Sequence, residues 1–546
     1  MIEYSKLRFL IVDDVTDFRS ALTSMLRQLG VAEIVAATSG EQALSLCRRS
    51  TYDVILHGYQ LGAGKNGQQV LEELHHQGLI SPHAVFVILS ADNSQAMVLA
   101  ALECEPDSYL TIPFNLTSLR QRLDALLRMK SIFRPVFDAQ LQSNHLDVLK
   151  ACARITQQHP DYAPHCHRHQ VAALAGLGRQ QDQEQLLQKL VDERPTPWAL
   201  VALGNLWRTT NRLDQARTLY EEGIHQFPML PALYDGLAAT AVAQGDPEQA
   251  QQFLAQGLRV SPNSLQRQQR MGQLAQQNQD HDQATRSFRQ AVELGRHSLF
   301  SDPEDHLNLV SSLNAQAGDG RLGHRPLAEI RKTLSELHKT WQADQPLQIR
   351  AQLLQARSLV NAGQAAEAQK LAVQAAAQVA DLEGFFSADA ALQVAEQLRQ
   401  LGQPEQADRV LAICAEMYGD DPAVLADIAR YTDDPAILQA GSHAIEWNRQ
   451  AMQLYQQQDY PAALQLFRQA LASQPRNISF ALNTAQSLLR LLHGTTTAEL
   501  ITECQRCLHQ ASGIPASDPR RERYQKLAGH LDTLTSDNPD PAPLIT

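Results

Sequence analysis

The sequence contains no long hydrophobic run, which excludes a membrane-spanning helix of the usual kind. Nowhere do its 546 residues approach a stretch of about 18 consecutive apolar side chains, the length that crosses a bilayer. The N-terminal MIEYSKLR leads directly into a short apolar run, without the hydrophobic region of a secretion signal. We therefore expect a cytoplasmic protein that is not inserted into a membrane.

Positive charge is also scarce. The chain carries 47 Lys and Arg against 59 Asp and Glu, and its net charge is −12 at pH 7. Proteins that bind nucleic acid mainly through electrostatics need a basic surface to displace counterions. The composition therefore argues against a nucleic-acid partner.

Cysteines are few, and they do not suggest a disulfide framework. Seven are scattered over the chain, an odd number. Cys504 and Cys507 form one CxxC with His509 nearby, but no second ligand pair follows at a matching distance. His165 and His169 share one helical face, the spacing with which two imidazoles can hold a cation. At the cysteines the alternatives are zinc or redox chemistry and an ordinary helix, and at the histidines they are a cation site and a solvated helix start. The lack of further ligands favours the ordinary helix at both places.

A chain of this length is too long for one hydrophobic core, so several domains or a repeat array are expected. Residues 7–128 alternate short apolar runs with amphipathic helical stretches, and Ser39 stands at an expected N-cap. The predicted order is strand 7–14, helix 18–30, strand 32–37, helix 39–49, strand 52–58, helix 66–78, strand 84–91, helix 94–104, strand 107–114 and helix 115–130. Five strand-helix units predict a parallel sheet, whose functional residues gather at the carboxyl ends of the strands.

The residues at those strand ends carry a resemblance. Asp13 and Asp14 follow the first strand, Ser90 the fourth, and Ile112 with Pro113 the fifth. This order resembles the receiver domain of bacterial two-component response regulators, which implies a flavodoxin-like (βα)5 fold over residues 1–130. In that family the two acids bind Mg²⁺, an aspartate after the third strand accepts phosphate, the Ser contacts the phosphoryl group, and a Lys before a cis-proline pairs with it.

Two positions depart from the family pattern. Gly58 stands where the phosphoacceptor is expected, and Ile112 stands where the lysine is expected. Glycine offers no nucleophile, so we expect no phosphorylation, and the loss of a carboxylate leaves only weak Mg²⁺ binding at Asp13 and Asp14. Without the lysine, repulsion between these acids should raise at least one pKa. The neighbouring His57 should face the opposite side of the sheet because side chains alternate along a strand.

Tyr109 matches the family's switch aromatic. The resemblance implies that such a residue packs inward in the active state and links the pocket to the face formed by the last two strands. Ordinary core packing is the alternative. The two roles distinguish a switch from an inert folded module.

The sequence changes character after residue 130. We expect residues 131–143 to be an irregular linker because they contain Pro135, and we expect Phe133 and Phe137 to dock the first domain on the second. From residue 144 the composition becomes rich in Ala, Leu and Gln with helical periodicity.

This second part repeats with a period of 34 residues. Leu203, Gly204, Ala216, Tyr220 and Gly223 in one unit correspond to Leu237, Ala238, Ala250, Leu254 and Gly257 in the next. The pattern resembles the tetratricopeptide repeat and implies an α-helical solenoid. The expected segments are a first array at 144–296, an irregular helical insertion or longer helical hairpin at 297–345, a second array at 346–534 and a disordered tail at 535–546.

Such a solenoid binds peptides or partner helices in a concave groove. The groove positions are expected at Trp198, Val201, Asn205, Arg208, Asp235, Gln269 and Gln273. Asn205 lacks the lysines that would accompany it in a carboxylate clamp, so no clamp is predicted. Trp198 is either an anchor for a partner or a residue packed between repeats.

Together these features predict an atypical response regulator, α/β followed by all-α, that is not an enzyme and has no cofactor beyond weak Mg²⁺. The expected role is a protein adaptor in bacterial signal transduction. The alternative is a receiver that responds to a ligand or partner and controls access to the groove. No convergent set of nucleophile, base and oxyanion donors supports an enzyme.

Overall fold

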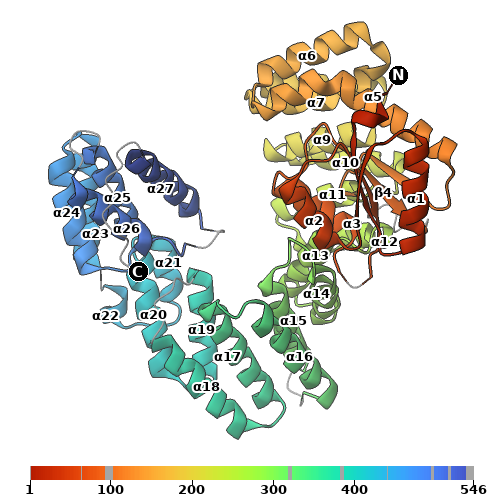
Figure 1. Cartoon of the computed structure of the whole chain (residues 1–546). Coiled ribbons are helices and arrows are strands. Elements are labelled where there is room, and N and C mark those ends of the chain that lie inside the picture. The colour runs from red at the N-terminus through yellow and green to blue at the C-terminus, as the bar shows by residue number, and fades with distance from the viewer. Residues whose placement is uncertain are drawn as a thin grey trace. The chain divides into compact units, whose positions relative to one another are not determined.

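The computed structural model describes residues 2–62, 64–92, 103–317, 322–380, 387–439, 441–492, 497–514 and 518–536. The chain divides into two compact units, Met1–Asp305 and His306–Thr546. The first unit contains a sheet and helices, and the described part of the second unit is helical (Figure 1).

The first unit begins with a five-stranded parallel sheet in the order β2-β1-β3-β4-β5. The strands are β1 (Arg8–Val12), β2 (Glu33–Ala37), β3 (Val54–Gly58), β4 (Val85–Ser90) and β5 (Ser108–Thr111), with helices α1 (Thr16–Gln28), α2 (Gly40–Arg49), α3 (Gly67–His76) and α5 (Leu116–Leu141). The flavodoxin-like order confirms the predicted fold. The predicted helix 94–104 lies mostly outside the described residues.

The sheet separates two apolar cores. Leu10, Ile55 and Phe86 belong to the core on the α2 and α3 side, whereas Phe9 and Leu56 belong to the core on the other face. The alternation follows from the pleat of each strand. Ser39 caps α2 by accepting from the backbone N–H of Gln42, as predicted.

The prediction that residues 131–143 are irregular is wrong, because helix α5 continues without a break to Leu141. Pro135 lies inside this helix and removes one backbone donor. Burial of Phe133 and Phe137 offsets that cost. Phe133 packs on Tyr162 and His169, whereas the Phe137 ring meets His83 of the first domain. Docking by the two phenylalanines is therefore confirmed.

Paired antiparallel helices follow in the first unit. They are α6 (His145–Gln158), α7 (Ala163–Gly176), α8 (Gln180–Glu193), α9 (Pro197–Thr209), α10 (Leu213–Gln226), α11 (Pro231–Ala243), α12 (Pro247–Val260), α13 (Leu265–Gln277) and α14 (His281–Gly295). Gly204 shows why small residues recur, because a Cβ added there would lie 2.4 Å from the ring of Tyr220. The α9 and α10 helices therefore cross closely enough that only glycine fits.

Within the described residues, the predicted helical insertion at 297–345 contains two regular helices. Helix α15 (Pro303–Gln316) crosses the boundary between the units, and α16 (His324–Thr340) follows. The glycine-rich residues 317–323 separate these two helices, and 318–321 lie outside the described residues. In the second unit, Asn314 of α15 donates to Ser358 at 2.9 Å, which ties α15 to the helix that contains Ser358.

Most of the second unit shares one apolar core that extends from Ile349 to Leu531. Its further helices are α17 (Gln345–Asn361), α18 (Ala365–Ala380), α19 (Ala388–Gln400), α20 (Pro404–Tyr418), α21 (Pro422–Ile428), α22 (Pro435–Leu438), α23 (Ser442–Gln456), α24 (Tyr460–Ser473), α25 (Ile478–Leu492), α26 (Ala498–Gln510) and α27 (Arg520–Ser536). The predicted tail at 535–546 begins inside α27, and residues 537–546 lie outside the described part. Among the described helices, none combines the length and apolar character needed to cross a bilayer.

Candidate functional site

The first candidate site lies at the carboxyl ends of β1 and β3. Asp13 is 7% exposed, and its Oδ1 accepts from the backbone N–H of Val15 at 2.8 Å. Arg19 donates to the backbone oxygen of Asp13 at 2.6 Å, not to its carboxylate. Asp14 is exposed. The two acids therefore differ, since one is buried and hydrogen-bonded and the other faces solvent.

Gly58 ends β3 directly opposite Asp13. A Cβ added at Gly58 would lie 2.7 Å from Oδ2 of Asp13 and 3.1 Å from Cδ2 of Leu61. The Asp13 carboxylate thus fills the space in which a side chain at position 58 would begin. This arrangement leaves no nucleophilic side chain at the end of β3.

Burial raises the pKa of the Asp13 carboxyl, and the neighbouring Asp14 adds to the rise, while the Val15 N–H and Arg19 act against it. The sequence predicted a raised pKa from repulsion between the two acids. The direction is confirmed, but desolvation is the larger cause. The sequence alone could not predict the desolvation, because it does not show how deeply each carboxylate is buried.

The other predicted pocket residues contact the backbone of Asp92 or pack against the two cores. Ser90 Oγ accepts from the Asp92 N–H at 3.1 Å, and the Tyr109 hydroxyl donates to the Asp92 carbonyl at 2.6 Å. Tyr109 is partly buried against the core on the α2 and α3 side, whereas Ile112, joined to Pro113 by a cis peptide bond, packs against the opposite core. An apolar side chain thus stands where a phosphate-pairing cation would be needed.

His57 belongs to the opposite side of β3, as predicted. Its ring stacks on Phe86 with centroids 5.8 Å apart, and its Nδ1 donates to the Gly58 carbonyl at 2.6 Å. Burial lowers the pKa of His57 to about 4, so the ring is neutral near pH 7. The side chain contributes to packing and does not reach Asp13.

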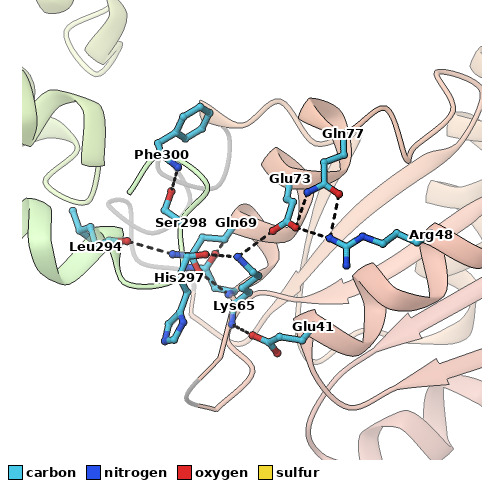
Figure 2. A network of polar contacts seen from close by, with 11 residues as sticks. Glu41, Arg48, Lys65, Gln69, Glu73, Gln77, Leu294, His297, Ser298 and Phe300 are labelled. Carbon is cyan, nitrogen blue, oxygen red and sulfur yellow. Dashed lines mark hydrogen bonds and ion pairs between the residues drawn. The ribbon is translucent and has the colours of Figure 1, made fainter. Parts of the chain in front are cut away.

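The loop after β3 makes a second kind of contact, because it joins the sheet domain to the repeat helices. Lys65 Nζ donates to the carbonyl of His297 at 2.6 Å and pairs with Glu73 at 3.0 Å. Gln69 Nε2 donates to the carbonyl of Leu294 at 3.3 Å, at the last turn of α14 (Figure 2). A cation and an amide donor therefore meet the electronegative C-terminal end of a helix.

The carboxylates of Glu103 and Glu105 meet arginines of the repeat helices. Arg267 on α13 is 5% exposed and holds Asp235 through two hydrogen bonds of 2.8 and 2.7 Å. Its Nη2 also lies 3.2 Å from the Glu103 carboxylate. Arg168 on α7 pairs with Glu105 at 3.3 Å and stacks over the ring of Trp198.

A cavity of about 760 Å³ lies between these carboxylates and helices α9, α11 and α13. Of the predicted groove residues, it brings together Trp198, Val201, Asn205 and Asp235. Arg208, Gln269 and Gln273 are not part of its lining. Gln269 donates instead to Asp305 at 2.8 Å and to the carbonyl of Phe300. The cavity therefore contains the positions expected on α9 and α11, and Arg267 and Arg270 line it from α13 in place of the expected Gln269 and Gln273.

Sequence reasoning missed Arg267, although the repeat period contained the signal. Positions 199, 233 and 267 are separated by 34 residues, and the first two are Ala199 and Leu233, both fully buried. An arginine in a buried register position requires a charged partner. The partner from the sheet domain, Glu103, was not recognisable from the repeat pattern.

The two clusters considered as metal sites are packed within the fold. Cys504 and Cys507 are buried, and burial raises their thiol pKa values to about 12 and about 11. His169 contacts Phe133 and Phe137, and burial lowers its pKa to about 4. Within the part of the chain that the structure describes, no three His, Cys, Asp or Glu side chains gather as a metal site.

Comparison with known proteins agrees with both parts of the fold. Residues 9–124 match the family described as "Response regulator receiver domain", and residues 448–513 match "Tetratricopeptide repeat". The match to the repeat family covers α23 to α26, later in the chain than the units at 203–257 that show the 34-residue period.

The relatives match the N-terminal domain. Transcriptional regulatory protein CiaR of Streptococcus pneumoniae is 32% identical over 127 residues, which are 23% of this chain and 54% of the relative. The probable chemotaxis protein CheY of Rhizobium etli is 26% identical over 121 residues, 22% of this chain and 92% of the relative. The solved receiver domain of a Francisella response regulator is 26% identical, with a TM-score of 0.21, and the match covers 22% of this chain and 98% of that one. The chain thus spans about half the length of the first of these relatives.

Proposed function

We propose that the protein is a response regulator that accepts no phosphate and acts as an adaptor between proteins. Residues 9–124 form a response regulator receiver domain, and tetratricopeptide repeats lie further along the chain. Receiver domains and tetratricopeptide repeats are protein-interaction modules, not enzyme families. The proposed role therefore includes no catalytic step and no cofactor beyond weak Mg²⁺ binding at Asp13 and Asp14.

The observation that carries the proposal is the relationship between Gly58 and Asp13. Aspartyl phosphate formation needs a carboxylate at the end of β3, and position 58 offers none. The Asp13 Oδ2 lies 2.7 Å from the place where a side chain there would start. The second requirement is a cation that balances the phosphoryl charge, and the apolar Ile112 stands in its place.

The loop that carries this altered position supports an interaction role. Lys65 lies in the loop after Gly58, and Gln69 lies in the first turn of α3. They donate to the carbonyls of His297, just beyond α14, and of Leu294, in its last turn. The receiver is therefore joined to the repeats by the segment that would otherwise surround a phosphate. We propose that intramolecular docking is what this loop now does.

The test is phosphorylation of the full chain. The protein is incubated with Mg²⁺ and acetyl phosphate, and its intact mass is measured before and after mild base, which cleaves acyl phosphates. We expect no added phosphate on the wild-type chain. The Gly58→Asp/Ile112→Lys variant is the matched positive control. A stoichiometric base-labile phosphate on residues 9–124 of the wild-type chain overturns the proposal.

A second candidate is a receiver that controls access to the groove in response to a partner. Glu103 and Glu105 of the receiver lie against Arg267 and Arg168 of the repeats. These contacts place receiver side chains at the cavity lined by Trp198. The switch differs from the inert adaptor in one measurable way, because removal of the two carboxylates would change binding to the repeats.

A further inference from the structure

The cavity between the receiver and the repeats is lined by more basic than acidic repeat residues. Arg168, Arg267 and Arg270 line it from α7 and α13, and Asp235 is the acidic side chain that the repeats contribute to its lining. Trp198 adds an aromatic face, with Arg168 stacked over it at 5.4 Å. The repeat side therefore complements a ligand that carries negative charge and some apolar surface.

The receiver already presents such chemistry to this place. Glu103 lies 3.2 Å from Arg267, and Glu105 lies 3.3 Å from Arg168. Two carboxylates separated by one residue thus meet two arginines that come from different helices. This short acidic segment is an intramolecular example of what the cavity binds.

The two contacts are weaker than the bond that fixes Arg267 within the repeats. Asp235 binds Arg267 through two nitrogens, whereas Glu103 meets one of those nitrogens from further away. Burial raises the pKa of the Glu103 carboxyl although Arg267 acts in the opposite direction. The Arg168 and Glu105 side chains are both largely exposed, and such ion pairs contribute little. A competing carboxylate can therefore replace the receiver without disturbing Asp235.

We propose that this cavity binds an acidic peptide segment of a partner protein, in which one carboxylate replaces Glu103 at Arg267 and an apolar side chain packs on Trp198. The inference rests on the proposed adaptor function, since it names the class of partner that the repeats bind. It also makes Glu103 and Glu105 an internal competitor, so that partner binding and release of the receiver contact are linked.

The test measures binding of one defined probe to the full chain. The probe is a fluorescein-labelled heptapeptide with the sequence of residues 103–109, in which Ser replaces Cys104, and fluorescence anisotropy reports its affinity. We expect the Glu103→Gln/Glu105→Gln variant to bind it about tenfold more tightly than the wild type, because the internal competitor is lost. A probe with Gln in place of both glutamates should bind at least about tenfold more weakly to that variant.

Arginine variants in the Glu103→Gln/Glu105→Gln background locate the site. Arg267→Gln should abolish binding, but it leaves Asp235 without its partner and can impair folding. Arg270→Gln changes an exposed residue of the same lining and should weaken binding about threefold to tenfold without loss of helical signal. Arg217→Gln, on α10 and outside the cavity, is the matched control and should bind as its parent does.

Three results would overturn the inference. One is equal affinity of the wild type and the double glutamate variant, and another is binding that Arg270→Gln leaves unchanged. The third is displacement of the probe by a single-stranded oligonucleotide at lower concentration than by unlabelled peptide, which would assign the cavity to phosphates. The assay contains no phosphodonor, so its failure is separate from a failure of the phosphorylation test.

Discussion

The Oδ2 atom of Asp13 lies 2.7 Å from the position that a Cβ at Gly58 would occupy. In this receiver domain the Asp13 carboxylate lies where a side chain at position 58 would begin. Because Asp13 is also buried and hydrogen-bonded to the Val15 N–H, the residue at position 58 cannot change without moving it.

The first prediction follows from this contact. Gly58→Ala should reduce the stability of β3 by about 1–3 kcal/mol, because the new methyl group overpacks against the Asp13 carboxylate. In an Asp13→Ala background the same change should cost much less, since the obstructing oxygens are gone. Hydrogen exchange of the β1 and β3 amides in the full chain measures both effects. Equal costs in the two backgrounds would show that the contact does not constrain position 58.

A second prediction concerns pH and Asp305, which accepts from Gln269 at 2.8 Å. Burial raises its pKa from 3.8 to about 6, and Asp302 and Glu304 add to the rise. A carboxyl whose folded-state pKa is raised stabilises the fold below its unfolded pKa and loses that contribution as pH rises through the folded value.

Asp305→Asn should therefore gain stability relative to the wild type as pH rises from 3.8 through about 6, by about 3 kcal/mol in total. Above that range the difference should be constant. Exchange protection of α13 amides, corrected for the intrinsic rate at each pH, provides the measurement. A difference that falls with rising pH would contradict the assigned burial of this carboxyl.

A third prediction tests the docking of the loop after β3. Lys65→Met removes the donor to the His297 carbonyl and the ion pair with Glu73. We expect about 1 kcal/mol less protection at residues 294–298 and at the start of α3, which is typical for one such interaction at a helix C-terminus.

Lys150→Met is the matched control for this experiment. Lys150 is an exposed lysine that pairs with Asp147 at 2.9 Å on the same helix. Loss of the Lys150 charge should leave the exchange protection of residues 294–298 unchanged. If both variants had the same effect there, general charge and not the local contact of Lys65 would be responsible.

A fourth prediction separates the two roles of Tyr109. Its hydroxyl donates to the Asp92 carbonyl, and its ring packs against the core on the α2 and α3 side. Tyr109→Phe should cost about 1 kcal/mol in the receiver and leave binding of the acidic probe unchanged, because only a hydrogen bond is lost. Anisotropy titration together with exchange of the β5 amides measures the two quantities. A change in probe affinity with no change in exchange would identify Tyr109 as a switch residue.

The sheet domain was predictable from the sequence because each element follows from a local pattern. Leu10 and Ile55 alternate with Phe9 and Leu56 between the two cores, and Ser39 caps α2 where expected. The repeat helices were predictable for the same reason, since Gly204 marks a close crossing. Local rules failed at Pro135, where burial of the flanking phenylalanines outweighs the helix-breaking tendency of proline.

The candidate site was predictable in part. Gly58 and Ile112 identified the altered pocket, because the chemistry of a missing nucleophile depends on residue type alone. The cavity lined by Glu103 and by the repeat helices could not be predicted, because it depends on which surfaces of the two domains come into contact. Glu103 is separated from Arg267 by 164 positions, and no local pattern in either segment names the other. The one available signal was the arginine in a buried repeat position.

The most direct test of the account is hydrogen exchange of the full wild-type chain with and without Mg²⁺ and beryllofluoride, which stands in for a phosphoryl group in receiver domains. We predict no change in protection at β3, at Lys65 to Gln69, or at residues 263–298, and a change at β3 in the Gly58→Asp/Ile112→Lys variant. Increased protection of these segments in the wild-type chain would show that the pocket still binds a phosphoryl group, and would contradict the central claim.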